Sequence, residues 1–359
     1  MKTNRLFTDF YRTIILRVVL GLFLSISLNA FAQFLPQTEL NVVGGRSTRL
    51  TYTDVEKPFW SDTLSERSAG AVTAQIKGFD EMGLKGQELM RLMGQGVIEF
   101  GVLPLSYYAP DNPLFEAVDI AGLASSSSIA KETASAFSPV LSHYLSSSQQ
   151  IKMLGIAPYG AQFLFCNTEM RGLSDLRGQT IRTITQTQAE LFEALGAKSV
   201  NIPFGEVLNA LEKKTITCAV AGALSGYTAK WYTVTTHLFA LPIGWNQEVH
   251  AVNQKAWDKL SPPLQGFIEA NIEQLIENLW VFSEKLTKRG IDCNTGSKEC
   301  ALIPRGQMTL VVPTAADLAL VKRLATQKVL SAWAERCSDS CVADYNQTVG
   351  KLLKTNVKK

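Results

Sequence analysis

The sequence predicts an α/β fold divided into two lobes, and three observations support this prediction. Apolar, strand-like stretches alternate with helix-like stretches between residues 39 and 103, which implies parallel strands joined by crossover helices. Removing a leader of residues 1–32 from the 359 residues leaves 327, more than a typical single domain contains. Apolar residues also recur at helical spacing from Ser261 to about Lys288, which predicts an unusually long helix.

The shorter elements follow from local patterns. Short apolar stretches predict strands at residues 39–44, 72–79, 97–103, 151–156, 163–166, 180–183 and 216–221. Helical patterns lie at residues 55–68, 86–93, 130–145 and 186–195. The long helix begins favourably, because Ser261 supplies a cap and the two prolines that follow fit a first turn. The apolar spacing of this helix is compatible with two arrangements, a core helix that packs under one lobe and a helix that runs under both lobes.

The first 32 residues are typical of a secretory signal. A basic leader comes first, formed by Lys2, Arg5, Arg12 and Arg17. An apolar run from Val18 to Leu28 follows, and Ala30-Phe31-Ala32 then supplies small residues for cleavage before Gln33. An uncleaved anchor is the alternative, but the run is shorter than the roughly 20 residues that a span needs. We therefore expect a periplasmic protein, cleaved after Ala32.

The leader also carries the net charge. It contains four Lys or Arg and one Asp, a balance of +3, and the whole chain is +3, so the mature protein is near zero. Proteins that bind nucleic acid or a membrane surface need a basic patch, and no dense run of Lys and Arg follows the leader. We expect no nucleic-acid partner.

Cysteine spacing predicts two local disulfides, Cys293–Cys300 and Cys337–Cys341, each closing a short polar loop. A four-cysteine metal site is the alternative, but the spacings do not form C-x-x-C pairs. Two further cysteines lie in apolar, strand-like stretches, where buried thiols and a third bridge are equally compatible with the pattern: Cys166 and Cys218.

Arg182 ends a distinctive segment. Residues Leu173–Arg182 form a polar turn, a glycine and a short strand that delivers the arginine, and Ile202–Leu211 follows about twenty residues later. This order closely resembles the solute-binding proteins of TRAP (tripartite ATP-independent periplasmic) transporters, in the DctP-like family. The resemblance implies that the arginine grips the carboxylate of a small organic acid. A guanidinium suits that role, because it stays charged and offers parallel N–H donors.

The resemblance covers roughly Leu40 to Leu286. It is carried further by Ser47–Thr53, Gly83–Gly101, Val234–His237 and Val252–Leu260. It implies a two-lobe periplasmic binding protein fold with the long helix spanning both lobes. The implied division is 33–157 for lobe I, 158–245 for lobe II, 246–288 for the return to lobe I and the interlobe helix, and 289–359 for a C-terminal segment mainly of lobe II.

Two departures from the family pattern bear on the ligand. Gln162 stands where many members carry a second arginine, and Ala221 stands where the family has a ligand-facing asparagine. Replacing the family's arginine and asparagine with these residues leaves more space and more apolar surface at the expected ligand site. This divergent branch is therefore expected to bind a bulkier or less polar acid, a monocarboxylate rather than a dicarboxylate.

The expected site combines the arginine with neutral and aromatic groups. Its members are Arg182, Gln162, Ser225 and Asn246 for hydrogen bonding, with Tyr107 and Trp245 as aromatic walls. Ser225-Gly226 is interpreted as a turn. The expected partners of a monomer are the acid and the TRAP membrane permease subunits. A sensory protein that presents its ligand to a membrane receptor is an alternative.

An enzyme is the other alternative, specifically a secreted two-lobe hydrolase. It would need a nucleophile beside a base, but a Gly-x-Ser-x-Gly motif is absent from the sequence. His143, His237 and His250 form no metal-ligand pair at helical spacing. We therefore expect neither catalysis nor a cofactor or metal.

Overall fold

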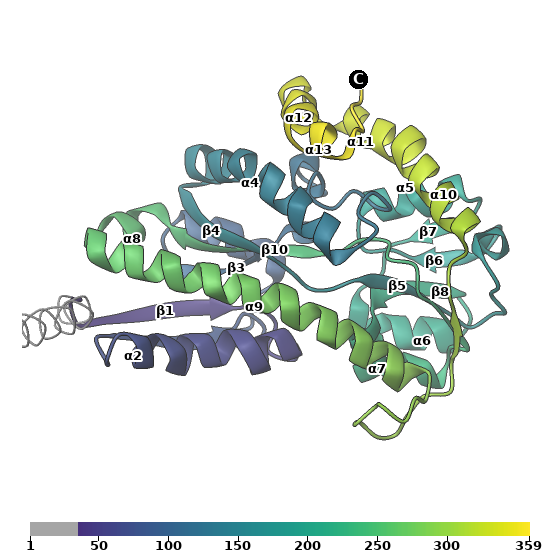
Figure 1. The fold of residues 1–359 in the computed structure, drawn as a ribbon, viewed down its shortest axis with the longest axis horizontal. Helices are drawn as coiled ribbons and strands as arrows, with labels where there is room; N and C mark the ends of the chain where they lie inside the picture. The colour runs from purple at the N-terminus through teal and green to yellow at the C-terminus, as the bar shows by residue number, and fades with distance from the viewer. Residues whose placement is uncertain (1–34) are drawn as a thin grey trace, which may run out of the picture.

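The computed structural model describes residues 35–359, so the expected signal and its cleavage site lie outside the described part of the chain. Within that part the chain forms two mixed β-sheets, which are the centres of two lobes lying side by side (Figure 1). The sheet of the first lobe runs in the order β2 (Val72–Gly78), β1 (Thr38–Gly44), β3 (Phe100–Pro104), β10 (Gln247–Asn253) and β4 (Ile151–Pro158). The sheet of the second lobe runs in the order β11 (Thr309–Val311), β9 (His237–Phe239), β5 (Gln162–Cys166), β8 (Cys218–Gly222), β6 (Thr180–Arg182) and β7 (Lys198–Val200).

The first sheet confirms the parallel arrangement predicted from alternation, because β1 pairs in parallel with both β2 and β3. Strand β3 begins at Phe100 and not at Val97, since the amides of Val97 and Ile98 bond to Leu92 O and close the preceding helix. The sequence did not predict β10, which enters from far along the chain. It lies antiparallel between β3 and β4 and completes the sheet.

Helices surround the two sheets. In the first lobe they are η2 (Tyr52–Glu56), η3 (Phe59–Thr63), α2 (Leu64–Arg67), η4 (Gly86–Glu88), α3 (Leu89–Gly94), η5 (Leu105–Tyr107), η6 (Pro113–Glu116) and α4 (Ser127–Gln149). In the second lobe they are η7 (Leu173–Leu176), α5 (Gln186–Ala194), η8 (Phe204–Glu206), α6 (Val207–Glu212), α7 (Ala223–Thr228) and η9 (Trp231–Thr233). The turn predicted at Ser225-Gly226 is wrong, because both residues lie within α7.

The long helix is confirmed. After α8 (Gln254–Asp258), helix α9 extends over Pro262–Asn294, six residues beyond the predicted end. It contacts β4 in the first lobe and α7 in the second, and so passes along both (Figure 1). Ser261 occupies the cap position, but its hydroxyl makes no capping hydrogen bond. No helix of residues 35–359 combines the length and the apolar character that a membrane span requires.

Disulfides are present at both predicted pairs, Cys293–Cys300 and Cys337–Cys341. The open question about Cys166 and Cys218 is settled in favour of a bridge. The two residues face each other directly across the antiparallel strands β5 and β8, so strand pairing brings together cysteines that are 52 residues apart.

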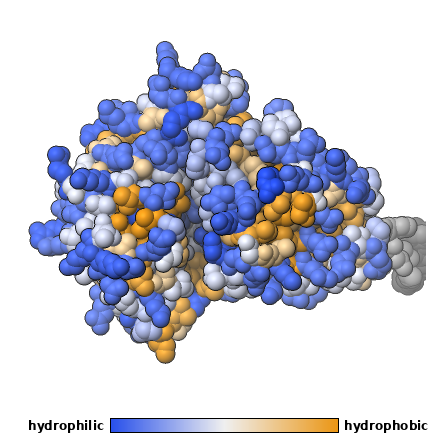
Figure 2. All heavy atoms as spheres, turned by 180° about the vertical axis from the view of Figure 1, so that it is seen from behind, coloured by the Kyte–Doolittle hydropathy of each residue, from blue (hydrophilic) through white to orange (hydrophobic). Residues whose placement is uncertain are grey.

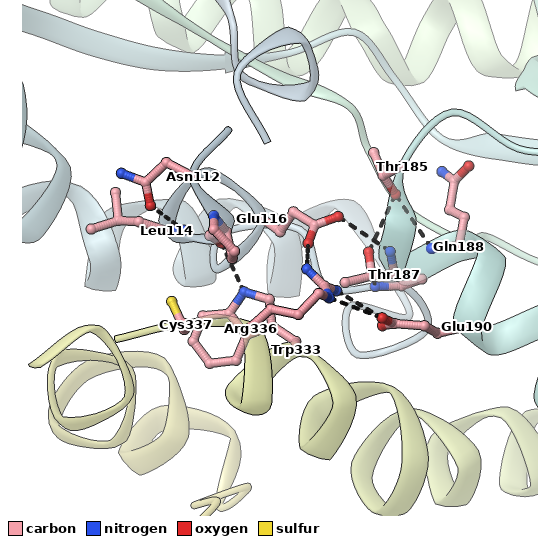
Figure 3. A network of polar contacts seen from close by, with 12 residues as sticks. Asn112, Leu114, Glu116, Thr185, Thr187, Gln188, Glu190, Trp333, Arg336 and Cys337 are labelled. Carbon is pink, nitrogen blue, oxygen red and sulfur yellow. Dashed lines mark hydrogen bonds and ion pairs between the residues drawn. The ribbon is translucent and has the colours of Figure 1, made fainter. Parts of the chain in front are cut away.

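The chain ends in α10 (Ala315–Leu324), η10 (Ala325–Val329), α11 (Leu330–Arg336), α12 (Asp339–Tyr345), η11 (Asn346–Gly350) and α13 (Lys351–Leu353). These helices contact both lobes, through α5 on one side and α4 on the other. Arg336 anchors them (Figure 3). Its Nη1 lies 2.7 Å from Glu116 Oε2 and its Nε donates to Glu190 Oε1 at 3.1 Å, while Glu116 also accepts the amide of Thr187.

Candidate functional site

A cavity of about 650 Å³ lies between the lobes. The space-filling surface is hollowed between the two lobes on the face opposite to Figure 1 (Figure 2). The cavity wall combines loops of the first lobe (46, 48–51, 79–80, 84–87, 106–107 and 110), the crossing segment 159–162 with Asn246, elements of the second lobe (182, 184, 201–204, 221–225 and 228) and two residues of α9, Leu286 and Thr287.

Arg182 lies at the end of β6 and lines this cavity. Its side chain is fixed by two backbone carbonyls, since Nε donates to Ile202 O at 3.1 Å and Nη1 donates to Val220 O at 2.8 Å. The residue is only 6% exposed, yet no carboxylate of residues 35–359 lies within ion-pair distance. Burial lowers the pKa of Arg182 to about 10, so the guanidinium stays charged at neutral pH.

Gln162 and Asn246 lie where the chain crosses between the lobes. Gln162 is buried, and its side-chain Nε2 donates to Gly160 O at 2.8 Å. Asn246 adopts a positive φ of 49°, and its buried Oδ1 has no hydrogen-bond partner among the described residues. Both line the cavity, so the carbonyl end of Gln162 and the amide of Asn246 are available to a ligand.

A carboxylate holds this crossing in shape. Asp119 Oδ2 accepts the amides of Trp245 at 2.9 Å and Asn246 at 2.7 Å. Burial raises the pKa of Asp119 to about 7, although the two amides oppose that rise by stabilising the charged form.

The remaining predicted residues divide into two groups. Ser225 and Tyr107 line the cavity, Ser225 from the first turn of α7 and Tyr107 from the opposite lobe. Trp245 does not line it. Its indole is buried and donates to Ala124 O at 3.3 Å, so this aromatic ring belongs to the packing behind the crossing rather than to the wall.

The cavity contains cationic groups besides Arg182. Arg46, Arg49 and Lys85 also line it, all from the first lobe. The guanidinium of Arg49 lies 3.2 Å from the centre of the Tyr159 ring, and that of Arg46 lies 5.1 Å from the centre of Phe79. Arg49 lies in Ser47–Thr53, which the resemblance matches to the family's first ligand-facing loop, so a sequence signal for this residue was present although it was not predicted as a site residue.

Two buried carboxyl groups lie behind the wall. Glu56 accepts the amide of Gly45 at 3.1 Å, and Glu248 has an oxygen without a partner among the described residues. Burial raises the pKa of both groups, and their proximity raises the pKa of Glu56 further. The charge of Arg49 opposes the rise at Glu248 but does not cancel it.

The second lobe contributes an apolar part of the wall. Phe204, Ile202 and Leu224 line the cavity beside Arg182. Phe204 is 42% exposed and packs at 5.2 Å between ring centres against the fully buried Trp231. No group of His, Cys, Asp and Glu in residues 35–359 could hold a metal ion.

Two α/β lobes joined by crossing segments, with a charged cavity between them, define the class of two-lobe binding proteins. A family model places the chain more narrowly. Residues 46–292 match the model of the DctP family, described as bacterial extracellular solute-binding protein, family 7, and the chain belongs to that family. The members of this family are solute-binding proteins rather than enzymes. The family is extracytoplasmic, and this protein is therefore assigned to a location outside the cytoplasm.

Solved structures share the fold. A Bordetella pertussis extracytoplasmic solute receptor, DctP7, binds pyroglutamic acid; it is 18% identical, with a TM-score of 0.72 over 86% of this chain and 99% of its own. A TRAP solute-binding protein from Desulfovibrio salexigens with bound orotic acid is 20% identical, with a TM-score of 0.73 over 88% and 97%. One from Ochrobactrum anthropi, with its C-terminus in the ligand-binding pocket, is 19% identical, with a TM-score of 0.77 over 90% and 98%. No curated protein sequence matches the chain.

Proposed function

We propose that this protein is the periplasmic solute-binding subunit of a TRAP transporter and that it captures a small monocarboxylic acid in the interlobe cavity. The observation that carries the proposal is Arg182, a buried and charged guanidinium without a counter-ion among the described residues. A buried charge without a partner is costly, and a ligand carboxylate would remove that cost.

The geometry of Arg182 suits a two-pronged grip. Two of its five N–H donors, one on Nε and one on Nη1, are taken by backbone carbonyls. The other hydrogen on Nη1 and both on Nη2 remain, and these donors are available to the two oxygens of a carboxylate. Gln162, Asn246 and Ser225 line the same cavity and would add hydrogen bonds to the acid.

Closure of the lobes follows from the position of the cavity. Its wall is contributed by both lobes, so a bound acid contacts both and stabilises the closed state. Removing water from the closed cavity strengthens the ion pair. We propose that the closed monomer is the form that docks on the membrane permease subunits and delivers the acid.

Binding measurements on Arg182 variants test this function. A thermal-shift screen of small acids, including pyroglutamate, orotate and galacturonate, identifies a ligand, and isothermal titration then gives its affinity. Arg182→Ala should weaken binding by at least about a hundredfold, because charge-assisted hydrogen bonds contribute about 1.5–3 kcal/mol each. Arg182→Lys should restore only part of the loss, since an ammonium lacks the planar fork.

Arg171 provides the matched control. It is an exposed arginine of the same lobe, and it pairs with Glu169. Arg171→Ala should bind as tightly as the unmodified protein. If Arg182→Ala also binds as tightly, or if no acid stabilises the protein, the proposed function is wrong.

A further inference from the structure

We propose that the C-terminal helices present a basic surface that binds anionic phospholipid headgroups and holds the protein against a membrane. The surface belongs to residues 315–359, here called the C-terminal cap, which comprise the elements from α10 to α13 and the tail that follows them. The cap projects from the two lobes (Figure 1). None of its residues lines the interlobe cavity, so the inference does not depend on which acid binds there.

The charge of the mature chain is divided between the cap and the lobes. The side chains of residues 315–359 include eight Lys or Arg and four Asp or Glu, a balance of +4. Those of residues 33–314 include 23 Lys or Arg and 27 Asp or Glu, a balance of −4. The near-zero net charge of the mature protein is therefore the sum of a positive cap and negatively charged lobes.

The cap packs against the lobes with its apolar side and two of its charged groups. From α10 to α11 the buried side chains are Val321, Ala325, Val329, Leu330, Trp333 and Ala334, and these elements contact α5. Arg336 pairs with Glu116 and Glu190. Asp317 accepts the amide of Leu173 at 3.1 Å. These two charged groups of the cap are therefore occupied by the lobes.

The outer surface of the cap carries the other basic side chains. The exposed ones are Lys322, Arg323, Lys328, Lys351, Lys354, Lys358 and Lys359. The exposed acids of the cap are Glu335 and Asp339, and Asp339 pairs with Lys359 at 3.1 Å. Six basic side chains therefore have no ion pair to residues 35–359, on a cap whose surface is mostly hydrophilic at the top of Figure 2.

The tail that follows α13 is fixed against the rest of the cap. The amide of Val357 donates to Asn346 Oδ1 at 2.8 Å, and Lys359 Nζ donates to the C-cap carbonyl of α11 at 3.0 Å. Lys354 and Lys358 are consequently held beside the cap helices. The fold thus gathers basic residues that are dispersed over 322–359, which explains why no dense run of Lys and Arg indicated this surface in the sequence.

An exposed apolar side chain within this surface favours a lipid bilayer over an acidic protein as the partner. Leu352 is 40% exposed and lies in sequence between Lys351 and Lys354. On a membrane, apolar groups enter the headgroup region while basic side chains contact the phosphates. Clusters of about four to eight Lys or Arg are typical of segments that bind anionic lipids. The cap combines both features.

Vesicle binding by the full mature protein tests the proposal. Co-sedimentation compares vesicles of phosphatidylglycerol mixed with phosphatidylcholine against vesicles of phosphatidylcholine alone, at low and at raised salt. We expect at least about tenfold stronger binding to the anionic vesicles at low salt, because several basic side chains contact the charged surface together. Raised salt should weaken this binding, since it screens exposed charges.

Two triple variants assign the binding to the cap, and each should weaken binding to anionic vesicles by at least about tenfold. The first combines Lys351→Gln, Lys354→Gln and Lys358→Gln. The second combines Lys322→Gln, Arg323→Gln and Lys328→Gln. The control removes the same charge from exposed lysines of the lobes, and its affinity should stay within about threefold: Lys57→Gln, Lys77→Gln and Lys213→Gln. Thermal unfolding verifies that each variant is folded.

The outcomes are separate from those for acid binding, because Arg182→Ala should bind vesicles as the unmodified protein does. Equal binding to both kinds of vesicle, or binding to neither, overturns the proposal. Unchanged binding by both cap variants also overturns it, as does an equal loss in the control, since net charge alone would then explain the effect. Binding to soluble poly-glutamate without binding to anionic vesicles rejects the lipid surface and indicates an acidic protein partner instead.

Discussion

The two lobes bring arginines to the same cavity but hold them differently. In the second lobe, two backbone carbonyls fix Arg182, which is buried and lacks a counter-ion among the described residues. In the first lobe, Arg49 is held by the face of one ring, with carboxyl groups behind it. The second lobe therefore offers a buried charge fixed by backbone carbonyls, and the first lobe offers a guanidinium supported by an aromatic face.

The same contrast extends to the cores. The second lobe is cross-linked by Cys166–Cys218 between neighbouring strands. The first lobe instead buries ionisable groups, among them Glu56, Glu248 and His250. We infer that breaking this disulfide destabilises the second lobe and that the stability of the first lobe changes with pH.

The largest expected effect is loss of the second-lobe disulfide. Replacing Cys166 and Cys218 by alanine opens a loop with a sequence separation of 52. Chain entropy then predicts a loss of about 4 kcal/mol, compared with about 2 kcal/mol for removing Cys337–Cys341, because the cost grows with loop length. Urea unfolding of the two double variants measures the difference. A smaller loss at Cys166–Cys218 would contradict the contrast between the lobes.

An intermediate effect is expected at His250, which has no hydrogen-bond partner for either ring nitrogen among residues 35–359. Burial lowers the pKa of His250 from 6.5 to about 4. The unfolded chain therefore binds a proton at this imidazole that the folded chain does not, and the His250 contribution to stability is lost as pH falls from about 6.5 towards 4, whereas the raised pKa values of Glu56 and Glu248 act in the opposite direction. His250→Leu removes that loss, so its stability relative to the unmodified protein should be about 2 kcal/mol greater at pH 5 than at pH 8.

Chemical denaturation at the two pH values measures this difference. The variant without the Cys166–Cys218 disulfide serves as the comparison, because its loss of stability relative to the unmodified protein should be similar at pH 8 and pH 5. An unchanged difference between His250→Leu and the unmodified protein from pH 8 to pH 5 would show that the buried imidazole does not control the response of the first lobe.

The smallest effect is expected on the surface of the first lobe. Lys131 and Glu277 form an ion pair between α4 and α9, with side chains 43% and 50% exposed. Exposed pairs contribute only about 0–1 kcal/mol, so Lys131→Ala should change the free energy of unfolding by less than about 1 kcal/mol. Added salt should make this difference in the free energy of unfolding smaller still. A loss larger than about 1 kcal/mol would show that this surface ion pair contributes more to the stability of the first lobe than exposed pairs usually do.

The sequence predicted features whose signal is local. Arg182 follows a turn, a glycine and a short strand, and α9 shows its apolar spacing along its length. Features that depend on distant partners were missed or left open. The position of Arg49 depends on Tyr159, more than a hundred residues away, and the Cys166–Cys218 bridge depends on strand register.

Trp245 shows the same limit in the opposite direction. It ends an apolar stretch close to the crossing, as a wall residue would, but its direction is set by Ala124 and by Asp119, which holds its amide. The position of Trp245 near the site in sequence therefore did not predict whether its indole faces the cavity or packs behind the crossing segment.

The place of β10 in the first sheet constrains the order in which the protein can be assembled. This strand, Gln247–Asn253, lies between β3 and β4 and is the neighbour through which β4 joins the sheet. While a ribosome makes the chain, the N-terminal part cannot complete a lobe before residue 253 has emerged, by which point most of the second lobe has been synthesised. The nascent chain consequently remains without a finished first core for most of its translation.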